Sequence, residues 1–275
     1  MSDLPRITVV VPSFNQGRFI EATLKSVLDQ EYPNLELMVI DGGSTDQTVE
    51  IVKRYEPRLS YWVSEKDRGQ THAINKGFAR ATGELVTWLN SDDLQESDAL
   101  RTIAAEYMSD PADVLYGDYA LITSNGSRFM EKKEIPFSFF LLLYGVNFIG
   151  QPSSFIRRTA LERFGYLDEN LHFMMDYEYW LRLASGGARF RHIPRRLSLY
   201  RYHETSKTVA MEVRFAEERQ AIRRRFTHDG RALIFLKSLA ARFLRQIVKL
   251  FRRGTIDYLG GPLRRVAYRA AEKRG

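Results

Sequence analysis

The chain has 275 residues, of which 44% are apolar and 27% charged, and it contains no cysteine. This composition is typical of a folded globular protein and excludes a disordered or collagen-like chain. Without cysteine, disulfide bonds and thiolate zinc sites are excluded too. The formal net charge of +7 is uneven, because residues 207–275 carry 18 Lys and Arg against six Asp and Glu, a net +12 that leaves −5 for residues 1–206.

Apolar runs typical of buried strands alternate with segments of helical periodicity in the first 90 residues. Strands are expected at 7–11, 35–40, 59–63 and 85–89, and helices at 17–30, 48–55 and 70–81. This alternation predicts βαβ units and an α/β fold with a mostly parallel sheet flanked by helices. Ligands of such sheets bind at the carboxyl ends of the strands. The loops at 12–16, 41–46, 64–70 and 90–93 are therefore expected to share one edge.

Further along the chain we expect a helix at 98–107, a strand at 113–122, a hairpin turn at 124–126, helices at 159–164 and 177–184, and a strand at 190–202. The longest uncharged stretch, between Glu134 and Arg157, contains Pro136 and Pro152. It is expected to be buried or to face a partner, since a polar backbone is costly in lipid. The first dozen residues lack the pattern of a signal peptide, so export by that route is not expected.

Two acidic motifs follow predicted strands. The segment Asn90-Ser-Asp-Asp93 comes directly after the strand at 85–89. Adjacent carboxylates there suit a divalent cation, although a helix-capping turn is an equally simple interpretation. Asp41 precedes two glycines, which permit close approach of a flat or anionic ligand; an ordinary turn has the same composition.

Two further motifs lie in the second half. Asp176, in MDYEYW, sits among aromatic neighbours at an expected helix start, where burial raises and the helix dipole lowers the pKa of a carboxylate. It is a candidate general base or a plain N-cap. In YRYHETSK, His203 is a candidate metal ligand and Lys207 is a candidate phosphate contact. The alternative is that both side chains are simply solvated.

Taken in order, these motifs resemble family 2 glycosyltransferases of the GT-A fold. The resemblance covers residues 6–207 and is carried by ITVVVPSFNQGRFIEATLKSVLDQ, VIDGGSTDQT, EKDRGQTHAINKGFARATGE, WLNSDD, GQPSSFIRR, FGYLDENL, MDYEYWLRL and YRYHETSKT. It implies a GT-A domain at 1–206, with a donor-binding half at about 1–113 and an acceptor-binding half at about 114–206. Residues 207–275 would form a basic, amphipathic helical extension.

The resemblance also implies roles for single residues. Asp176 would be the catalytic base, and Gln151 and Glu178 would contact the acceptor. Asp93 and His203 would hold Mn²⁺ or Mg²⁺. The implied donor-binding residues are Pro12, Phe14, Asn15, Asp41, Asp67, Arg68, Gly69, Asp92 and Lys207. The implied reaction is an inverting transfer from a nucleoside-diphosphate sugar, with uridine as the expected nucleoside, to an acceptor hydroxyl in bacterial surface polysaccharide or glycolipid synthesis.

The basic tail contains an amphipathic segment at 231–253, in which apolar residues recur at helical spacing and no acid occurs. This pattern is typical of a helix that lies on an anionic membrane surface. Its alternative is a helix that packs its apolar face on the catalytic domain and leaves its cations in water. The favoured interpretation is a cytoplasmic enzyme, peripheral at the inner face of the cell membrane, that acts on a glycan or a lipid-linked acceptor.

Two other classes of protein fit the sequence less well. A sugar nucleotidyltransferase needs a glycine-rich basic loop after the first strand, whereas residues 12–17 offer one glycine and no lysine. A non-catalytic carbohydrate- or nucleic-acid-binding module would explain the tail but would leave the acidic loops without a role. Nucleic acid is therefore not an expected partner, and the oligomeric state is open.

Overall fold

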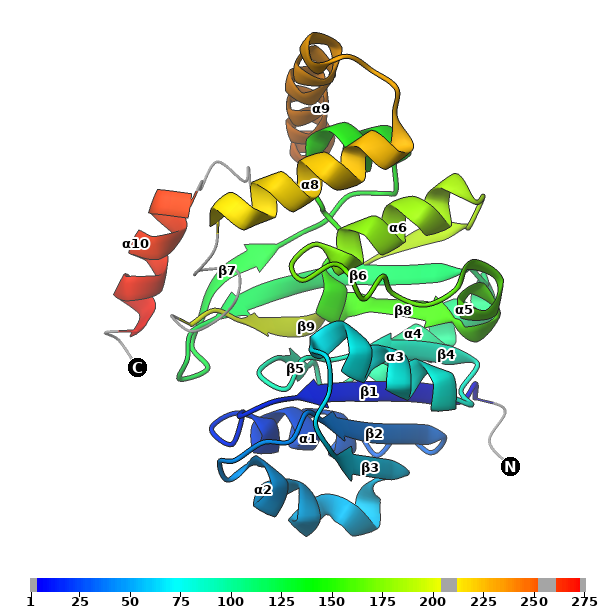
Figure 1. Ribbon diagram of the computed structural model, residues 1–275, viewed down its shortest axis with the longest axis vertical. Helices are drawn as coiled ribbons and strands as arrows, with labels where there is room; N and C mark the ends of the chain where they lie inside the picture. The colour runs from blue at the N-terminus through cyan, green and yellow to red at the C-terminus, as the bar shows by residue number, and fades with distance from the viewer. Residues whose placement is uncertain (1–3, 204–211, 252–260, 273–275) are drawn as a thin grey trace.

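The computed structural model describes residues 4–203, 212–251 and 261–272. A nine-stranded sheet runs along the molecule in the order β3-β2-β1-β4-β8-β6-β9-β5, with β7 paired to β6 (Figure 1). The predicted α/β class is confirmed. The strands are β1 (Ile7–Ser13), β2 (Leu35–Asp41), β3 (Tyr61–Ser64), β4 (Leu85–Trp88), β5 (Leu94–Gln95), β6 (Val114–Ile122), β7 (Arg128–Lys132), β8 (Ser154–Arg157) and β9 (Phe190–Arg201).

Helices cover both faces of this sheet because its strands are apolar on both sides. Val9 and Val11 of β1 pack with α1, α2 and α4, whereas Val10 faces α3, α5 and α6. The helices are α1 (Ile20–Leu28), α2 (Thr48–Tyr55), α3 (Gln70–Arg80), α4 (Ala99–Ser109), α5 (Arg158–Phe164), α6 (Met175–Ser185), α8 (Glu212–Phe226), α9 (Arg231–Phe251) and α10 (Gly261–Glu272), with short turns η1 (Glu56–Arg58), η2 (Leu141–Gly145) and η3 (Gln151–Ser153).

The alternation predicted for the first 90 residues is confirmed. β1 pairs in parallel with β2 and β4, and β2 pairs in parallel with β3. In this register Ser13 lies beside Asp41, and Asp41 beside Ser64. The loops that follow these strands therefore begin side by side at one edge of the sheet.

The second half contains the unpredicted strand β8 and an irregularity inside the predicted strand β9. The uncharged stretch is buried as expected, but its end forms an unpredicted strand, β8, which inserts antiparallel between β4 and β6. Four residues after a proline turn are too few to show a strand period. Pro194 lies inside β9, where the register with β6 shifts between Gly117 and Asp118, because a proline cannot donate a ladder hydrogen bond.

The C-terminal helices pack back onto the domain. α8 lies beside α6, α9 packs against η2, and α10 packs against β7 (Figure 1). α9 forms one end of the long axis of the molecule and α2 lies at the other end. None of the helices in the described part of the chain combines the length and apolar character needed to span a bilayer.

α9 packs on the domain through Ile234, Ala241 and Val248 together with two cations, and it leaves most of its large apolar side chains in solvent. Arg245 and Lys249 are buried, with side-chain nitrogens 3.1 and 3.9 Å from a carboxylate oxygen of Glu134. The alternative of a helix that packs on the domain is therefore met in part, but these two cations are buried and most of the large apolar residues are not. The large apolar side chains that α9 exposes are Leu233, Phe235, Leu236, Leu239, Phe243, Leu244, Leu250 and Phe251.

Candidate active site

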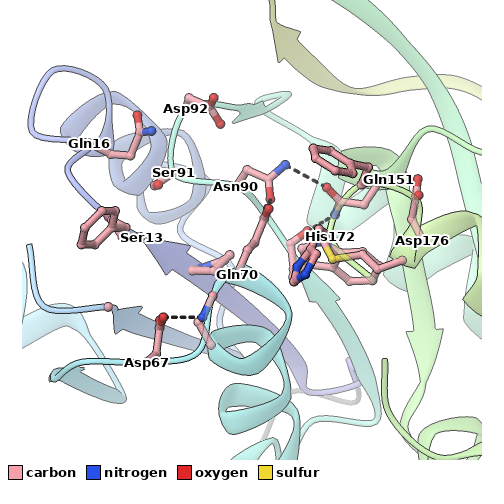
Figure 2. A pocket seen from close by; sticks show the side chains of 18 of the residues that line it. Ser13, Gln16, Asp67, Gln70, Asn90, Ser91, Asp92, Gln151, His172 and Asp176 are labelled. Carbon is pink, nitrogen blue, oxygen red and sulfur yellow. Dashed lines mark hydrogen bonds between the residues drawn. The ribbon is translucent and has the colours of Figure 1, made fainter. Parts of the chain in front are cut away.

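A cavity of about 660 Å³ opens at the carboxyl ends of β1, β2 and β4. Its walls come from segments far apart in the chain: the loop after β1, residues 66–70, the end of β4 with residues 90–92, and the start of α6 (Figure 2). Its volume is in the range that encloses a small-molecule ligand. Four loops therefore converge on one site at the edge that the strand pattern predicted.

The first wall contains four of the predicted donor-binding residues. Pro12, Phe14, Asp67 and Gly69 all line the cavity. Phe14 is 59% exposed and offers a flat apolar ring to a planar group. Asp67 accepts a hydrogen bond of 2.7 Å from the backbone N–H of Gly69, which fixes the turn before α3.

Asp41 and Asn15 hold this wall together but do not line the cavity. Asp41 is 1% exposed, and its carboxylate accepts hydrogen bonds from the backbone N–H of Gly43, from the N–H and hydroxyl of Ser44, and from the hydroxyl of Ser64. Asn15 Oδ1 accepts from the backbone N–H of Thr45. The predicted donor contacts do not fit this geometry, because the Asp41 carboxylate and the Asn15 amide oxygen bond to the loops themselves.

Gly42 completes the same wall and explains why Asp41 precedes a glycine. A Cβ atom on Gly42 would lie 2.7 Å from Oδ2 of Asp67. A larger residue would therefore push the two loops apart. Gly42 itself lines the cavity, so the backbone and not the Asp41 carboxylate faces a ligand here.

Arg68 and Lys207 are two further predicted donor contacts. Arg68 does not line the cavity; its guanidinium forms an ion pair of 2.6 Å with Glu169 at the surface. That ion pair connects the loop before α3 to the segment before α6, and the predicted donor contact of Arg68 stays a prediction. Lys207 lies outside the described residues.

The acidic pair after β4 is oriented differently from the prediction. Asp92 lines the cavity, whereas Asp93 is 1% exposed and points away from it. Asp93 accepts a hydrogen bond of 2.8 Å from the backbone N–H of Arg201 and one of 3.2 Å from the amide of Asn90. Burial first, and then the neighbouring charge of Asp92, raise the pKa of Asp93 well above its usual range. Asp93 therefore does not line the cavity, and the predicted metal contact through its side chain does not fit this geometry.

His203 meets Asp92 at the cavity, as its predicted role requires. Its Nε2 atom lies 2.9 Å from Oδ2 of Asp92, and both side chains line the cavity. Within the described ranges, no cluster of three or more His, Cys, Asp or Glu side chains is placed to hold a metal ion. Asp92 and His203 nevertheless fit a cation that takes its remaining ligands from phosphate oxygens and water, because Mg²⁺ and similar ions are commonly bound in that way.

A chain of side-chain amides forms the floor between the two halves of the cavity (Figure 2). Gln70 donates to Asn90 at 2.7 Å, Asn90 donates to Gln151 at 3.3 Å, and Gln151 donates to the carbonyl of Trp88 at 2.5 Å. Gln151 thereby lies in the cavity, and its contact with the acceptor stays a prediction. Gln70 and Asn90 were not predicted as contacts, although their places after strand ends are the signal that marks them.

Asp176 occupies the opposite wall, in the first turn of α6. Its Oδ2 atom accepts a hydrogen bond of 2.8 Å from Asn147, and its Oδ1 atom accepts one from the backbone N–H of Tyr177. Burial raises the pKa of Asp176 to about 6, although both donors act in the opposite direction. A partly exposed carboxylate with such a pKa is suited to accept a proton near neutral pH.

Glu218 of α8 supports the loop that carries Asp176. Its carboxylate accepts hydrogen bonds of 2.9, 2.9 and 2.7 Å from the backbone N–H groups of His172, Phe173 and Met174. Its negative charge also raises the pKa of Asp176. The sequence gives no signal for this contact, because Glu218 lies in the tail, 44 residues beyond Met174.

Glu178 does not reach the cavity. Its carboxylate is fully buried and forms ion pairs of 3.1 Å with Arg182 and with Arg225 of α8. Two residues beyond Asp176 on a helix, it faces a different direction. The prediction that Glu178 contacts the acceptor is therefore corrected, and its role is to fix α6 against α8.

An aromatic wall at the mouth of the cavity was also missed. His172, Phe173 and Phe215 line it, and the rings of Phe173 and Phe215 lie 5.0 Å apart. Phe215 comes from α8, so the tail contributes directly to the site. Aromatic faces of this kind can pack on the apolar faces of a sugar ring.

Comparisons with known proteins agree with this geometry. Residues 8–165 match the family described as glycosyl transferase family 2. An uncharacterized glycosyltransferase of Mycobacterium tuberculosis is 33% identical over 189 residues, which cover 67% of this chain and 71% of that protein. The putative teichuronic acid biosynthesis glycosyltransferase TuaG of Bacillus subtilis is 34% identical over 126 residues, 45% of this chain and 50% of that protein.

Solved structures share the fold. TarS of Staphylococcus aureus, residues 1–349 in complex with UDP-GlcNAc, has a TM-score of 0.65 at 21% identity, over 97% of this chain and 79% of that one. This chain spans 43% of the longer TarS chain, with a TM-score of 0.66 at 23% identity over 86% of this chain. The mannosyltransferase PcManGT of Pyrobaculum calidifontis, in complex with GDP-Man and Mn²⁺, has a TM-score of 0.61 at 21% identity, over 99% of this chain and 87% of that one.

The sheet with helices on both faces and the cavity at its strand ends thus define a GT-A glycosyltransferase. The chain belongs to glycosyl transferase family 2. This confirms the resemblance seen in the sequence and favours a glycosyltransferase over a nucleotidyltransferase or a non-catalytic binding module.

Proposed function

We propose that the protein transfers a sugar from a uridine-diphosphate sugar to an acceptor hydroxyl, with inversion at the anomeric carbon. The observation that carries this proposal is that Asp92 and His203 face the same cavity as Asp176. One cavity can therefore hold the donor diphosphate at one wall and the attacking hydroxyl at the other.

The donor is expected along the first wall. The ring of Phe14 offers a flat apolar surface to the base. The backbone at Gly42 offers polar groups that the ribose can approach closely. UDP-GlcNAc and UDP are the ligands of two TarS complexes that share this fold. We assign a uridine nucleotide to this chain on that support.

Asp92 and His203 would hold Mn²⁺ or Mg²⁺ beside the diphosphate. When bound, the ion would stabilise the negative charge that develops on the leaving phosphate. PcManGT carries Mn²⁺ together with its nucleotide sugar. Arg201 donates through Nε to the carbonyl of Asp92 and so fixes the turn that aims the Asp92 carboxylate at the cavity.

Asp176 would act as general base. The acceptor hydroxyl attacks the anomeric carbon as the bond to the diphosphate breaks, and its proton passes to Asp176. Asn147 holds the Asp176 carboxylate in place for this step. A single displacement of this kind inverts the anomeric centre.

The acceptor is proposed to be a surface polysaccharide or glycolipid intermediate. This rests on the relatives: TuaG is named for teichuronic acid biosynthesis, and a protein that is 29% identical over 69% of this chain is named a PGL/p-HBAD biosynthesis glycosyltransferase. The aromatic wall of Phe173 and Phe215 and the amide of Gln151 would contact the acceptor sugar.

The function is tested by nucleotide-sugar turnover. A thermal-shift screen of nucleoside diphosphates with Mn²⁺ is expected to select UDP, because a ligand that binds the folded state raises its melting temperature. The matching UDP-sugar should then be hydrolysed slowly without acceptor, in a metal-dependent way. A protein that binds no nucleoside diphosphate, with or without Mn²⁺, would refute the proposal.

We further propose that α9 holds the enzyme on the anionic surface of the cytoplasmic leaflet. Phe243, exposed by 70%, lies on the outward apolar face of α9. Replacing Leu236 and Phe243 by Ser should weaken recovery with anionic liposomes, whereas Met108→Ser, at an exposed apolar residue of α4, should not. Equal recovery of the Leu236/Phe243 variant and the wild type would contradict this assignment.

A further inference from the structure

A second cavity, of about 650 Å³, lies between α8 and the start of α9. We call it the arginine cavity. Its lining includes one acid, Asp229, whose carboxylate is already bonded to Lys237 at 2.7 Å and to the hydroxyl of Tyr144. The basic residues that line the arginine cavity are Arg219, Arg223, Arg224, His228 and Arg231.

The positive charge of the arginine cavity is not neutralised within the described ranges. No carboxylate there lies within ion-pair distance of Arg219, Arg224 or Arg231. Arg223 donates to the carbonyl of Gly145 at 2.9 Å and to the hydroxyl of Tyr177 at 3.3 Å, both uncharged. Burial, and then the charges of Arg223 and Arg242, lower the pKa of Arg219. Clustered guanidinium groups in a concave site match the geometry of phosphate oxygens.

α8 connects the arginine cavity to the catalytic cavity. Phe215 lines the catalytic cavity, and Arg219 and Arg223 follow it four and eight residues later on the helix. At about 1.5 Å per residue these positions lie about 6 and 12 Å along α8. Arg223 also contacts Tyr177, the residue after Asp176. The arginine cavity therefore begins about one helical turn along α8 from Phe215, which lines the catalytic cavity.

The other side of the arginine cavity adjoins α9. Ile234 of α9 lines it, and the exposed apolar face of α9 begins beside it at Leu233, Phe235 and Leu236. A phosphate bound in the arginine cavity would thus have a sugar-binding site on one side and an apolar surface on the other. A soluble phosphate compound without a lipid chain would not contact the apolar surface of α9.

We propose that the arginine cavity binds the diphosphate of a lipid-linked acceptor, with the acceptor sugar at Asp176 and the lipid chain along α9. The inference rests on the proposed function, because it names the acceptor class of the same catalytic cavity. In this arrangement the acceptor sugar lies at α6, the diphosphate at α8 and the lipid chain at α9.

The test measures binding of the full chain to phosphatidylcholine vesicles that contain a polyprenyl diphosphate. Vesicles with oleate at the same surface charge serve as the reference, because they carry negative charge without phosphate. The wild type should bind the diphosphate vesicles at least about tenfold more tightly than the oleate vesicles. The double variant Arg219→Gln/Arg224→Gln should lose about 10- to 30-fold in binding to the diphosphate vesicles, since each cation near lipid contributes about a factor of five.

The matched control removes two exposed cations far from the tail. The variant Lys25→Gln/Lys53→Gln, on α1 and α2, has the same charge change and should bind like the wild type. Equal binding of both double variants to diphosphate vesicles would overturn the inference, as would equal binding of the wild type to diphosphate and oleate vesicles. Binding of inorganic pyrophosphate without any preference for the diphosphate vesicles would overturn the lipid assignment.

Nucleotide binding separates this inference from the proposed function. The thermal shift produced by UDP and Mn²⁺ should be the same in the wild type and in both double variants, because none of the four residues lines the catalytic cavity. A wild type that binds UDP but ignores the lipid diphosphate refutes the inference alone. A wild type that fails to bind nucleotide refutes the proposed function.

Discussion

The amide of Asn147 donates a hydrogen bond of 2.8 Å to the carboxylate of Asp176. Asn147 follows the turn η2 and Asp176 begins α6, so this contact joins two segments that pack on the same face of the sheet. The hydrogen bond favours the charged carboxylate, whereas burial and the charge of Glu218 disfavour it. The pKa of the proposed base is thus set by contacts with opposite effects, and the contacts from Asn147 and Glu218 can each be removed by one substitution.

Replacing Asp176 by Asn removes the proposed base with little change of shape. Turnover should fall by about 10² to 10⁴-fold, the usual contribution of a positioned base, while UDP binding is retained. The measurement is the rate of UDP release from the selected UDP-sugar, with calorimetric titration of UDP as the control. Unchanged turnover would exclude Asp176 as the base.

The same variant should be more stable than the wild type at pH 7.5. The pKa of Asp176 is raised from 3.8 to about 6, so the folded state holds this proton more tightly than the unfolded chain. The charge on Asp176 therefore does not change the free energy of unfolding below pH 4. It lowers that free energy increasingly between pH 4 and 6, and by at most about 3 kcal/mol above pH 6. Asp176→Asn should raise the melting temperature by a few degrees at pH 7.5 and leave it unchanged at pH 4; a lower value at pH 7.5 would contradict this reasoning.

Activity should fall as the pH drops through about 6, because the base must be charged. Asn147→Ala removes a donor that favours the charge and should move this acidic limb to higher pH. Glu218→Gln removes a repelling charge and should move the limb to lower pH, with a smaller kcat because a glutamine accepts fewer of the three backbone hydrogen bonds.

Glu217→Gln is the matched control for Glu218→Gln. Glu217 is the preceding residue of α8 and is exposed. Its replacement should leave the pH profile unchanged. If Asn147→Ala and Glu218→Gln shifted the limb in the same direction, the pH dependence would belong to another group.

The two neighbouring carboxylates after β4 should behave differently. Asp92→Asn is expected to weaken Mn²⁺-dependent UDP binding at least about tenfold, because Asp92 faces the cavity beside His203. Asp93→Asn keeps a shape that can accept from the backbone N–H of Arg201, and should bind UDP within a few-fold of the wild type. Calorimetry with and without Mn²⁺ distinguishes them. The reverse pattern would restore the role that the sequence first assigned to Asp93.

Much of the fold is predictable because its signals are local. The strands β1, β2 and β4 are mostly apolar and buried, and the helices between them have clear periodicity. β8 is different, since its four residues become a strand through pairing with β4 and β6. That pairing depends on tertiary packing, which a short run does not reveal.

The sequence was sufficient to predict which loops form the site. It was not sufficient to predict which of their side chains face the cavity. Asp92 and Asp93 are adjacent, and what turns Asp93 inward is the backbone of Arg201, 108 residues away. The orientation of α9 depends in the same way on Glu134, a distant acid that draws Arg245 inward. Helical periodicity identifies an apolar face but not the side that faces the protein.

The most direct test is a crystal structure of the protein with UDP and Mn²⁺. We predict the metal bound to the carboxylate of Asp92 and the imidazole of His203, the uracil near Phe14, and open space between the diphosphate and Asp176. A metal ligated by Asp93, or a nucleotide bound outside the cavity that contains Asp92 and Asp176, would contradict the account.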